Sequence, residues 1–161
     1  MRYLGGKSRF KKEICGLINS LNPIFYYEPF IGGGSIFSGV NAQVKIGSDY
    51  CEALMTMWRA LQEGWEPPLN ITEDDYRKLQ KTKDPKDPMT AVAGFGLSFG
   101  GKWFEGWVGD KMGEDGRNHA LSVRRTLKDK IVGFGNCLLI HRSYADIAPY
   151  HSNVVVYCDP P

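Results

Sequence analysis

One stretch narrows the fold class more than any other part of this sequence. It is a short apolar run that is followed, after four further residues, by three consecutive glycines. Residues 24–27 (Ile-Phe-Tyr-Tyr) have the β-branched and aromatic content typical of a strand. Residues 28–35 (Glu-Pro-Phe-Ile-Gly-Gly-Gly-Ser) then predict a glycine turn that opens a helix. A second short strand is expected over 44–48, ending at Asp49. Strands, turns and helices in this order build a parallel sheet, so the sequence predicts an α/β fold.

Helical periodicity accounts for three further segments. Apolar residues spaced three and four apart predict helices over 10–21 and 51–61. A capping box beginning at Thr72 predicts a third helix that continues through Gln80.

The second half of the sequence returns to regular structure after an interruption. Residues 81–116 mix charge, proline and glycine in irregular order and are expected to form an insertion, followed by a basic helix over 117–130. Residues 137–140 and 154–157 are continuous apolar runs, as expected of buried parallel strands.

Composition leaves the binding partner open. The 161 residues include 20 Lys and Arg against 18 Asp and Glu, and a net charge of +2 requires neither a polyanion nor a membrane surface. No apolar run approaches the roughly 18 to 20 residues of a membrane span, and no signal peptide is evident, so we expect a cytoplasmic protein. The four cysteines form no CxxC pair, so neither a metal site nor a disulfide framework is expected.

The glycine turn and Asp49 together predict a nucleoside pocket. Glycines at a strand-to-helix turn let a ligand approach the backbone, and an acidic residue after the next strand is placed to accept hydrogen bonds from ribose hydroxyls. The run is not GxGxxG, so a nucleoside without a pyrophosphate fits better than NAD, and an NAD-type oxidoreductase is disfavoured. The alternative is a tight turn followed by an aspartate that caps a helix.

The run Asp159-Pro160-Pro161 follows the last apolar strand. Open α/β sheets place their chemistry at the carboxyl ends of strands, where this carboxylate is expected to lie. Proline fixes φ and has no N–H, so the turn is rigid and its carbonyl is not committed to a neighbouring strand. Asp159 and that carbonyl could accept both hydrogens of an exocyclic amine and free its lone pair for attack. The alternative is a proline-terminated strand with a solvated aspartate.

Residues 3–8 (Tyr-Leu-Gly-Gly-Lys-Ser) form a third motif. Its end is similar to a phosphate-binding loop, but such a loop needs a preceding strand and a first glycine where Met1 stands. An aromatic and a lysine held by two glycines are suited to lining a ligand pocket. The alternative is a flexible N-terminal arm with a solvated charge.

Together and in this order, these motifs resemble those of the Dam-like DNA adenine methyltransferases of phages and bacteria, which move a methyl group from S-adenosylmethionine to the adenine amino group. The segments that carry the resemblance are 3–7, 28–35, Asp49 and 159–161, with further similarity over 99–104 and 138–147. The resemblance implies a Rossmann-like methyltransferase sheet, partial here with about four mostly parallel strands, and a helical, glycine-rich insertion. It also implies direct transfer without a covalent intermediate or a metal, and the sequence lacks the Pro-Cys nucleophile motif of cytosine methyltransferases.

The resemblance assigns roles to individual residues. Tyr3 and Lys7 would flank the cofactor, Gly32 and Gly34 would approach its methionine portion, and Asp49 would take the ribose. The expected cofactor-binding set is Tyr3, Lys7, Glu28, Pro29, Phe30, Gly32, Gly34, Asp49 and Asp159, and the expected catalytic residues are Asp159 and Pro160.

Family members bind duplex DNA through an insertion and act on a flipped adenine. We therefore expect residues 1–61 to form the cofactor half of the core, 62–130 the recognition insertion and 131–161 the return to the core. The expected DNA-binding residues are Lys102, Trp103, Arg117, Arg124 and Arg125. The alternative for the aromatics near Trp103 is a small satellite core beneath a long loop.

Two departures from the family pattern affect these expectations. The pattern continues as Asp-Pro-Pro-Tyr, with the aromatic stacking on the flipped base, whereas this sequence ends at Pro161. Ser143 stands where an acidic residue is common near the adenine end of the cofactor. We expect the natural polypeptide to continue, or a second chain to cover the edge strand 154–157. The alternative function is a truncated or split module that binds cofactor and DNA without turnover.

Overall fold

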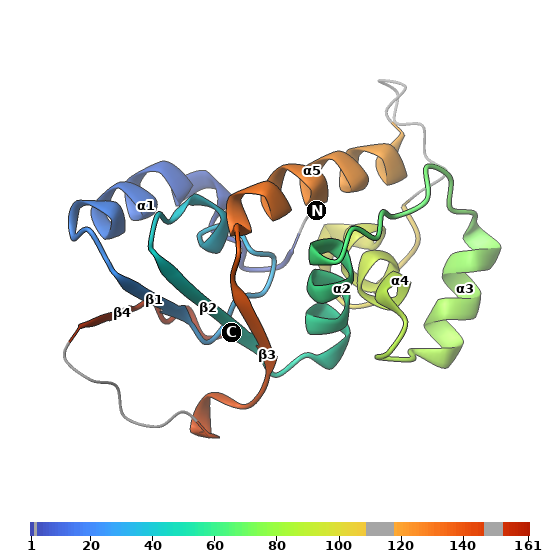
Figure 1. Cartoon of the computed structure of the whole chain (residues 1–161). Coiled ribbons are helices and arrows are strands. Elements are labelled where there is room, and N and C mark those ends of the chain that lie inside the picture. Colours follow the sequence, from blue (N-terminus) through green and yellow to red (C-terminus); the bar gives the residue numbers. More distant parts are fainter. Residues whose placement is uncertain (2, 109–117, 147–152) are drawn as a thin grey trace.

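The computed structural model describes residues 1, 3–108, 118–146 and 153–161 (Figure 1). Short 3-10 turns and one five-residue π-helical turn, Val92–Gly96, join the longer elements. The helices and strands are α1 (Lys11–Ser20), β1 (Phe25–Glu28), β2 (Val44–Asp49), α2 (Glu52–Gln62), α3 (Glu73–Thr82), α4 (Pro88–Ala91), α5 (His119–Phe134), β3 (Leu138–His141) and β4 (Val154–Val156).

The four strands form one sheet in the order β3-β2-β1-β4, and every pair is parallel. Tyr27 on β1 lies opposite Ile46 on β2 and Val156 on β4, which fixes the register of the centre of the sheet. Because the strands are parallel, their carboxyl ends meet at one edge. The predicted α/β fold with a parallel sheet is therefore confirmed.

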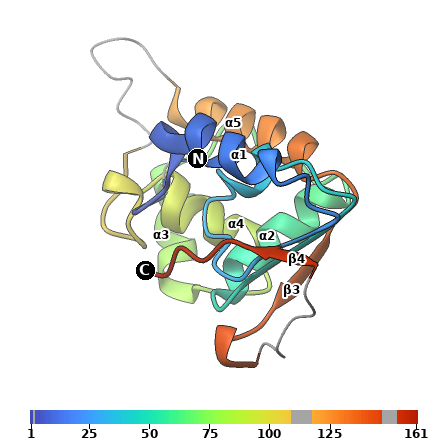
Figure 2. The same cartoon turned by 90° about the vertical axis from the view of Figure 1, so that its left-hand side faces the viewer.

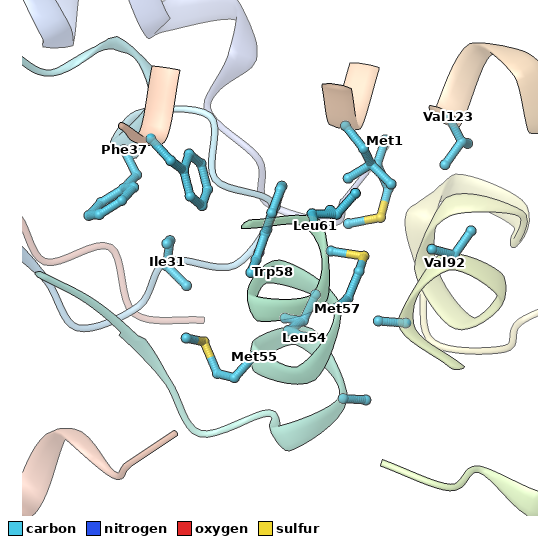
Figure 3. Close-up of a cluster of buried hydrophobic side chains, with 14 of the residues drawn as sticks. Met1, Ile31, Phe37, Leu54, Met55, Met57, Trp58, Leu61, Val92 and Val123 are labelled. Carbon is cyan, nitrogen blue, oxygen red and sulfur yellow. The ribbon is translucent and has the colours of Figure 1, made fainter. Parts of the chain in front are cut away.

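Helices α1 and α5 lie on the same side of the sheet, and α2, α3 and α4 are grouped beside it (Figures 1 and 2). The core is continuous between these two parts. Trp58 on α2 is fully buried and packs on Phe134 of α5, with ring centroids 4.7 Å apart. Figure 3 shows Trp58 in one cluster with Ile31, which directly precedes the three glycines, and Phe37, which follows them.

The capping box predicted at Thr72 is present. The Thr72 hydroxyl accepts from the Asp75 N–H at 3.2 Å, and the Asp75 carboxylate accepts from the Thr72 N–H at 3.1 Å. This pair satisfies two of the amide groups that a helix start leaves unbonded, so α3 begins at the predicted position.

The predicted helix over 10–21 is present as α1, but only part of its apolar stripe is buried. Ile18 is buried, whereas Phe10 and Leu17 are 59% and 70% exposed and Cys15 is buried beside Ile18. Cys15 lies against the turn before β2, where its thiol donates to the Ile36 carbonyl at 3.5 Å. A Cβ added at Gly39 would lie 2.6 Å from the Cys15 Sγ, so the two segments meet at this small pair of residues.

Strands β3 and β4 are less buried than their continuous apolar runs predict. Within the part of the chain that the structure describes, each pairs with one neighbouring strand, and Leu138 is 56% exposed while Val156 is 37% exposed. The described part of the insertion is more regular than expected, because α4 folds against α2 and the π-helical turn packs on α3 and α5. The expected boundary between 130 and 131 falls inside α5.

Among the described residues, no helix is both long and apolar enough to cross a bilayer. No group of three or more His, Cys, Asp or Glu side chains in the same residues is placed to hold a metal ion.

Candidate active site

The predicted motifs line one large cavity at the carboxyl ends of β1, β2 and β4. Its volume is about 1280 Å³, and its wall brings together segments more than 150 positions apart in the sequence, from Tyr3 to Asp159. This edge is where open parallel sheets bind ligands. The residues around the cavity are Tyr3 to Lys7, Glu28 to Gly33, Ser35, Ile36, Asp49, Tyr50, Phe95, Gly101 to Trp103, Glu105, Ser143, Tyr144 and Asp159 to Pro161.

The glycine turn has a shape that side chains would prevent. Gly32 and Gly34 have φ angles of +45° and +64°, in the left-handed region. A Cβ at Gly32 would lie 2.8 Å from the Tyr3 ring, and one at Gly34 would lie 2.7 Å from the Phe134 ring. The turn is thus packed between Tyr3 on one side and α5 on the other, and Trp58 Nε1 donates to the Gly32 carbonyl at 3.0 Å.

Asp49 holds this turn against the start of α2. One carboxylate oxygen accepts from the Gly32 N–H and the other from the Cys51 N–H, each at 2.9 Å. Burial raises the pKa of the Asp49 carboxyl, and these backbone N–H groups oppose the rise. A carboxylate has about four acceptor sites, so Asp49 can accept from Gly32, Tyr50 and Cys51 and still accept a hydrogen bond from a ligand hydroxyl.

Glu28 ends β1 at the floor of the cavity and is only 3% exposed. The pKa of its carboxyl is raised to about 8, mainly by burial and in addition by nearby Asp159 and Asp49. The Tyr26 hydroxyl, which donates to Glu28 Oε2 at 2.7 Å, and the Lys45 ammonium act in the opposite direction. Glu28 is therefore largely protonated at neutral pH, which avoids placing three anions around one cavity.

An ion pair joins the first and last motifs. Lys7 Nζ lies 2.7 Å from Asp159 Oδ1 and also donates to the Gly5 carbonyl at 2.9 Å. Both charged side chains are about one-third exposed or less. The contact uses one carboxylate oxygen of Asp159 and leaves the other beside the cavity.

Aromatic side chains that the motifs did not indicate complete the wall. Tyr144, which follows β3, lies 5.4 Å from Phe30 between ring centroids. Tyr50 comes directly after Asp49, and His141 Nε2 lies 3.1 Å from its carbonyl. The cavity therefore has an aromatic end near β3, where Ser143 also lies. In the sequence, the available indication was an aromatic residue within three positions after each of the first three strands, namely Phe30, Tyr50 and Tyr144.

Two of the residues expected to bind DNA, Lys102 and Trp103, lie at the cavity. Trp103 packs on Phe95 and Phe104, with ring centroids 4.7 and 4.8 Å apart. A Cβ at Gly94 would lie 2.5 Å from the Trp103 ring. The aromatic cluster therefore packs against the main core and is not a separate satellite core, and one side of it also forms part of the cavity wall.

The expected DNA-binding arginines lie elsewhere. Arg124 forms an ion pair with Glu66 and donates to the Pro67 carbonyl, so its guanidinium is used in joining α5 to the segment after α2. Arg125 is exposed on the same helix. Arg117 lies outside the described residues.

The sheet is parallel, and a cavity large enough for a nucleoside lies at its carboxyl edge. The glycine turn and Asp49, at the end of the second strand, border this cavity. This is the Rossmann-like arrangement of methyltransferases. A family model described as "D12 class N6 adenine-specific DNA methyltransferase" matches residues 3–91. The match covers more than half of the chain, which therefore belongs to this family of adenine-specific DNA methyltransferases. The matched region includes the motif at residues 3–8, the glycine turn at 28–35 and Asp49, whereas Asp159 lies beyond it. No curated protein matches the sequence.

Proposed function

We propose that this methyltransferase transfers the methyl group of S-adenosylmethionine to the exocyclic amino group of an adenine flipped out of double-stranded DNA. The observation that carries the proposal is the meeting of all predicted motifs in one cavity, from Tyr3 to Asp159. Its volume of about 1280 Å³ exceeds the roughly 300–1,000 Å³ of ordinary small-molecule pockets. That space suits a nucleoside cofactor together with a base.

The residues around the cavity fit the cofactor. Asp49 has acceptor capacity left for a ribose hydroxyl, and Gly32 and Gly33 bring backbone without side chains to the cavity. Gly34, also expected to bind the cofactor, packs on Phe134 and is not among the residues around the cavity, so we propose that it shapes the turn. Phe30 and Tyr144 supply aromatic surface suited to an adenine ring at the other end. Tyr3, Lys7, Glu28 and Pro29 complete the proposed cofactor set and border the same cavity.

The chemistry required of the protein is orientation of the target amine. When bound, S-adenosylmethionine supplies a methyl group on a positively charged sulfur, which the amine nitrogen attacks as the carbon–sulfur bond breaks. We assign Asp159 and the Pro160 carbonyl to accept the two amine hydrogens, so that the nitrogen lone pair is less delocalised into the purine ring. Lys7 occupies Oδ1 of Asp159, and this arrangement supports Oδ2 as the acceptor. One amine proton is lost as the product forms, and Asp159 is the adjacent base.

The position of Asp159 supports base flipping. It borders the same cavity as Lys102 and Trp103, and enzymes that modify a base take it out of the duplex stack into such a pocket. Lys102 is exposed and suited to a phosphate, and Trp103 presents an aromatic edge to an entering base. Arg117 and Arg125 remain proposed phosphate contacts, while the ion pair of Arg124 with Glu66 argues for a mainly structural use of that side chain.

We also propose that a second chain covers strand β4. In the described residues β4 pairs with β1 on one edge only, and its Val156 is 37% exposed. Unpaired strand edges favour further pairing. Light scattering during size-exclusion chromatography would report a dimer if this proposal is correct and a monomer if it is wrong.

Calorimetric titration and product analysis test the proposed reaction. We expect heat of binding with S-adenosylmethionine and none with NAD, and a loss of about tenfold or more in cofactor affinity for Asp49→Ala. Incubation with unmethylated duplex DNA should yield N6-methyladenine on digestion to nucleosides. Absence of S-adenosylmethionine binding by the wild-type protein would contradict the proposal.

A further inference from the structure

Lys130 reaches from helix α5 to the back of the glycine turn. Its ammonium donates to the Gly33 carbonyl at 2.5 Å and to the Ser35 hydroxyl at 2.9 Å. The N–H of Gly34, on the same peptide group as the Gly33 carbonyl, donates to the Ile31 carbonyl at 2.8 Å. The Gly33–Gly34 peptide is therefore held at both ends, by Lys130 and by the turn itself.

Burying the Lys130 ammonium costs free energy, because a charged group is less well solvated inside a protein than in water. Among the described residues, no salt-bridge partner lies within 4 Å of Lys130, and the charged groups that face it are Lys11 on α1, Glu28 on β1 and the amino group of Met1. The pKa of Lys130 is lowered to about 8, mainly by burial and in addition by repulsion from Lys11, while Glu28 opposes the change. A cation kept half-buried against a carbonyl at this cost indicates a use beyond solubility.

Other contacts of α5 and Ser35 converge on the same turn. Phe134 lies one helical turn after Lys130 and packs under Gly34, where an added Cβ would come within 2.7 Å of its ring. The Ser35 hydroxyl also lies 2.9 Å from the Ser8 hydroxyl. Ser8 follows Lys7, which pairs with Asp159. Lys130 thus stands at one end of a chain of contacts that leads to the proposed catalytic carboxylate.

We propose that Lys130 is a positioning residue, which holds the glycine turn in its cofactor-binding shape and places a positive charge behind the part of the turn that faces the methionine carboxylate. The inference rests on the proposed binding of S-adenosylmethionine to this turn. It separates Lys130 from Arg124 and Arg125 of the same helix, which were expected to bind DNA. Lys128, two residues earlier, is exposed and pairs with Glu66 at 2.5 Å.

Substitution of these two lysines provides a matched test. Lys130→Met should weaken S-adenosylmethionine binding by about 10-fold to 100-fold, the usual effect of losing a hydrogen bond from a charged donor. Lys128→Met should change it less than about twofold, because an exposed ion pair contributes little. Lys130→Arg keeps the charge and the donors, so we expect it to restore most of the affinity. Equal cofactor affinities for Lys130→Met and Lys128→Met would overturn the inference.

The pH dependence separates positioning from a merely structural role. The pKa of Lys130 is lowered from 10.5 to about 8, so the folded chain binds fewer protons than the unfolded chain between these values. Stability should therefore rise with pH in this window through Lys130, while cofactor affinity falls as the ammonium is lost. Glu28 and Lys45 also have pKa values of about 8, so the test is the difference between the wild-type and Lys130→Met profiles. Parallel affinity profiles would overturn the inference.

A ligand-free measurement distinguishes failure of this inference from failure of the proposed function. Hydrogen exchange at residues 32–35 should be faster in Lys130→Met than in Lys128→Met, with β1 unchanged. If the wild-type protein does not bind S-adenosylmethionine, the proposed function fails. If it binds normally and Lys130→Met changes neither affinity nor exchange in the turn, only the role of Lys130 fails. Should Lys130→Met not fold, the same comparison is made with Lys130→Gln and with the wild-type pH profile.

Discussion

Replacing Gly34 by alanine tests how tightly the glycine turn is packed. Its φ of +64° costs an L-amino acid roughly 1–2 kcal/mol. The new Cβ would lie 2.7 Å from Phe134 Cζ and 3.0 Å from Trp58 Cζ2, and both rings are fully buried. Overpacking of this kind adds about 1–3 kcal/mol, so we expect Gly34→Ala to lower the free energy of unfolding by about 2–5 kcal/mol.

Urea and thermal denaturation measure this loss. For a domain of this length the expected fall in Tm is about 4–20 °C. Gly64→Ala is the matched control, because Gly64 has a φ of +93° and an added Cβ would meet nothing within 4 Å. It should therefore cost only the roughly 1–2 kcal/mol of the backbone conformation.

A double mutant tests whether the contact with Phe134 causes the loss of stability in Gly34→Ala. In Gly34→Ala/Phe134→Leu the smaller side chain should relieve the contact, so that the combined loss is smaller than the sum of the single losses by about 0.5–3 kcal/mol. Equal destabilisation by Gly34→Ala and Gly64→Ala, with additive losses in the double mutant, would refute the packing that the structure shows around the turn.

Three further substitutions test charges near the cavity and on α5. The pKa of Glu28 is raised from 4.5 to about 8, so the folded chain binds more protons in this window and stability should fall as pH rises through it. Glu28→Gln should show a flatter profile by differential scanning fluorimetry between pH 5 and 9, and parallel profiles would contradict the assignment. Lys102→Ala should weaken DNA binding and reduce its salt dependence by about one phosphate contact, as measured by fluorescence anisotropy. Arg124→Ala should leave that salt dependence unchanged and cost about 0.2–1 kcal/mol of stability, since Arg124 pairs with Glu66; a reduced salt slope would show instead that it contacts DNA.

The features that could be predicted from the sequence are those determined locally. The first strand, the turn at Gly32 and Gly34 and the capping box at Thr72 each depend on a few consecutive residues, and all three are present. The helix expected to open at the glycine turn is wrong, because only the short 3-10 turn Phe37–Gly39 lies between the glycines and β2. Asp49 follows the second strand and bonds the glycine turn, because parallel strands place their carboxyl ends together.

The features that could not be predicted depend on distant packing. The apolar periodicity predicted helix α1, but it could not show that Cys15 rather than Leu17 packs against the turn before β2. Lys130 lies 97 positions from Gly33 in the sequence, and its basic neighbours made it indistinguishable from a solvated charge. The raised pKa of Glu28 results from burial by the assembled core and has no local indication.

Single-turnover methylation by Asp159→Asn tests the central claim most directly. Asparagine keeps the size of the side chain but replaces one acceptor oxygen with a donor, so it cannot hold the target amine as a carboxylate does. At saturating S-adenosylmethionine and unmethylated duplex DNA, we expect the rate to fall about 100-fold or more. Asp129→Asn, an exposed aspartate on α5, serves as the control and should keep the wild-type rate. A wild-type rate of N6-methyladenine formation by Asp159→Asn would contradict the account.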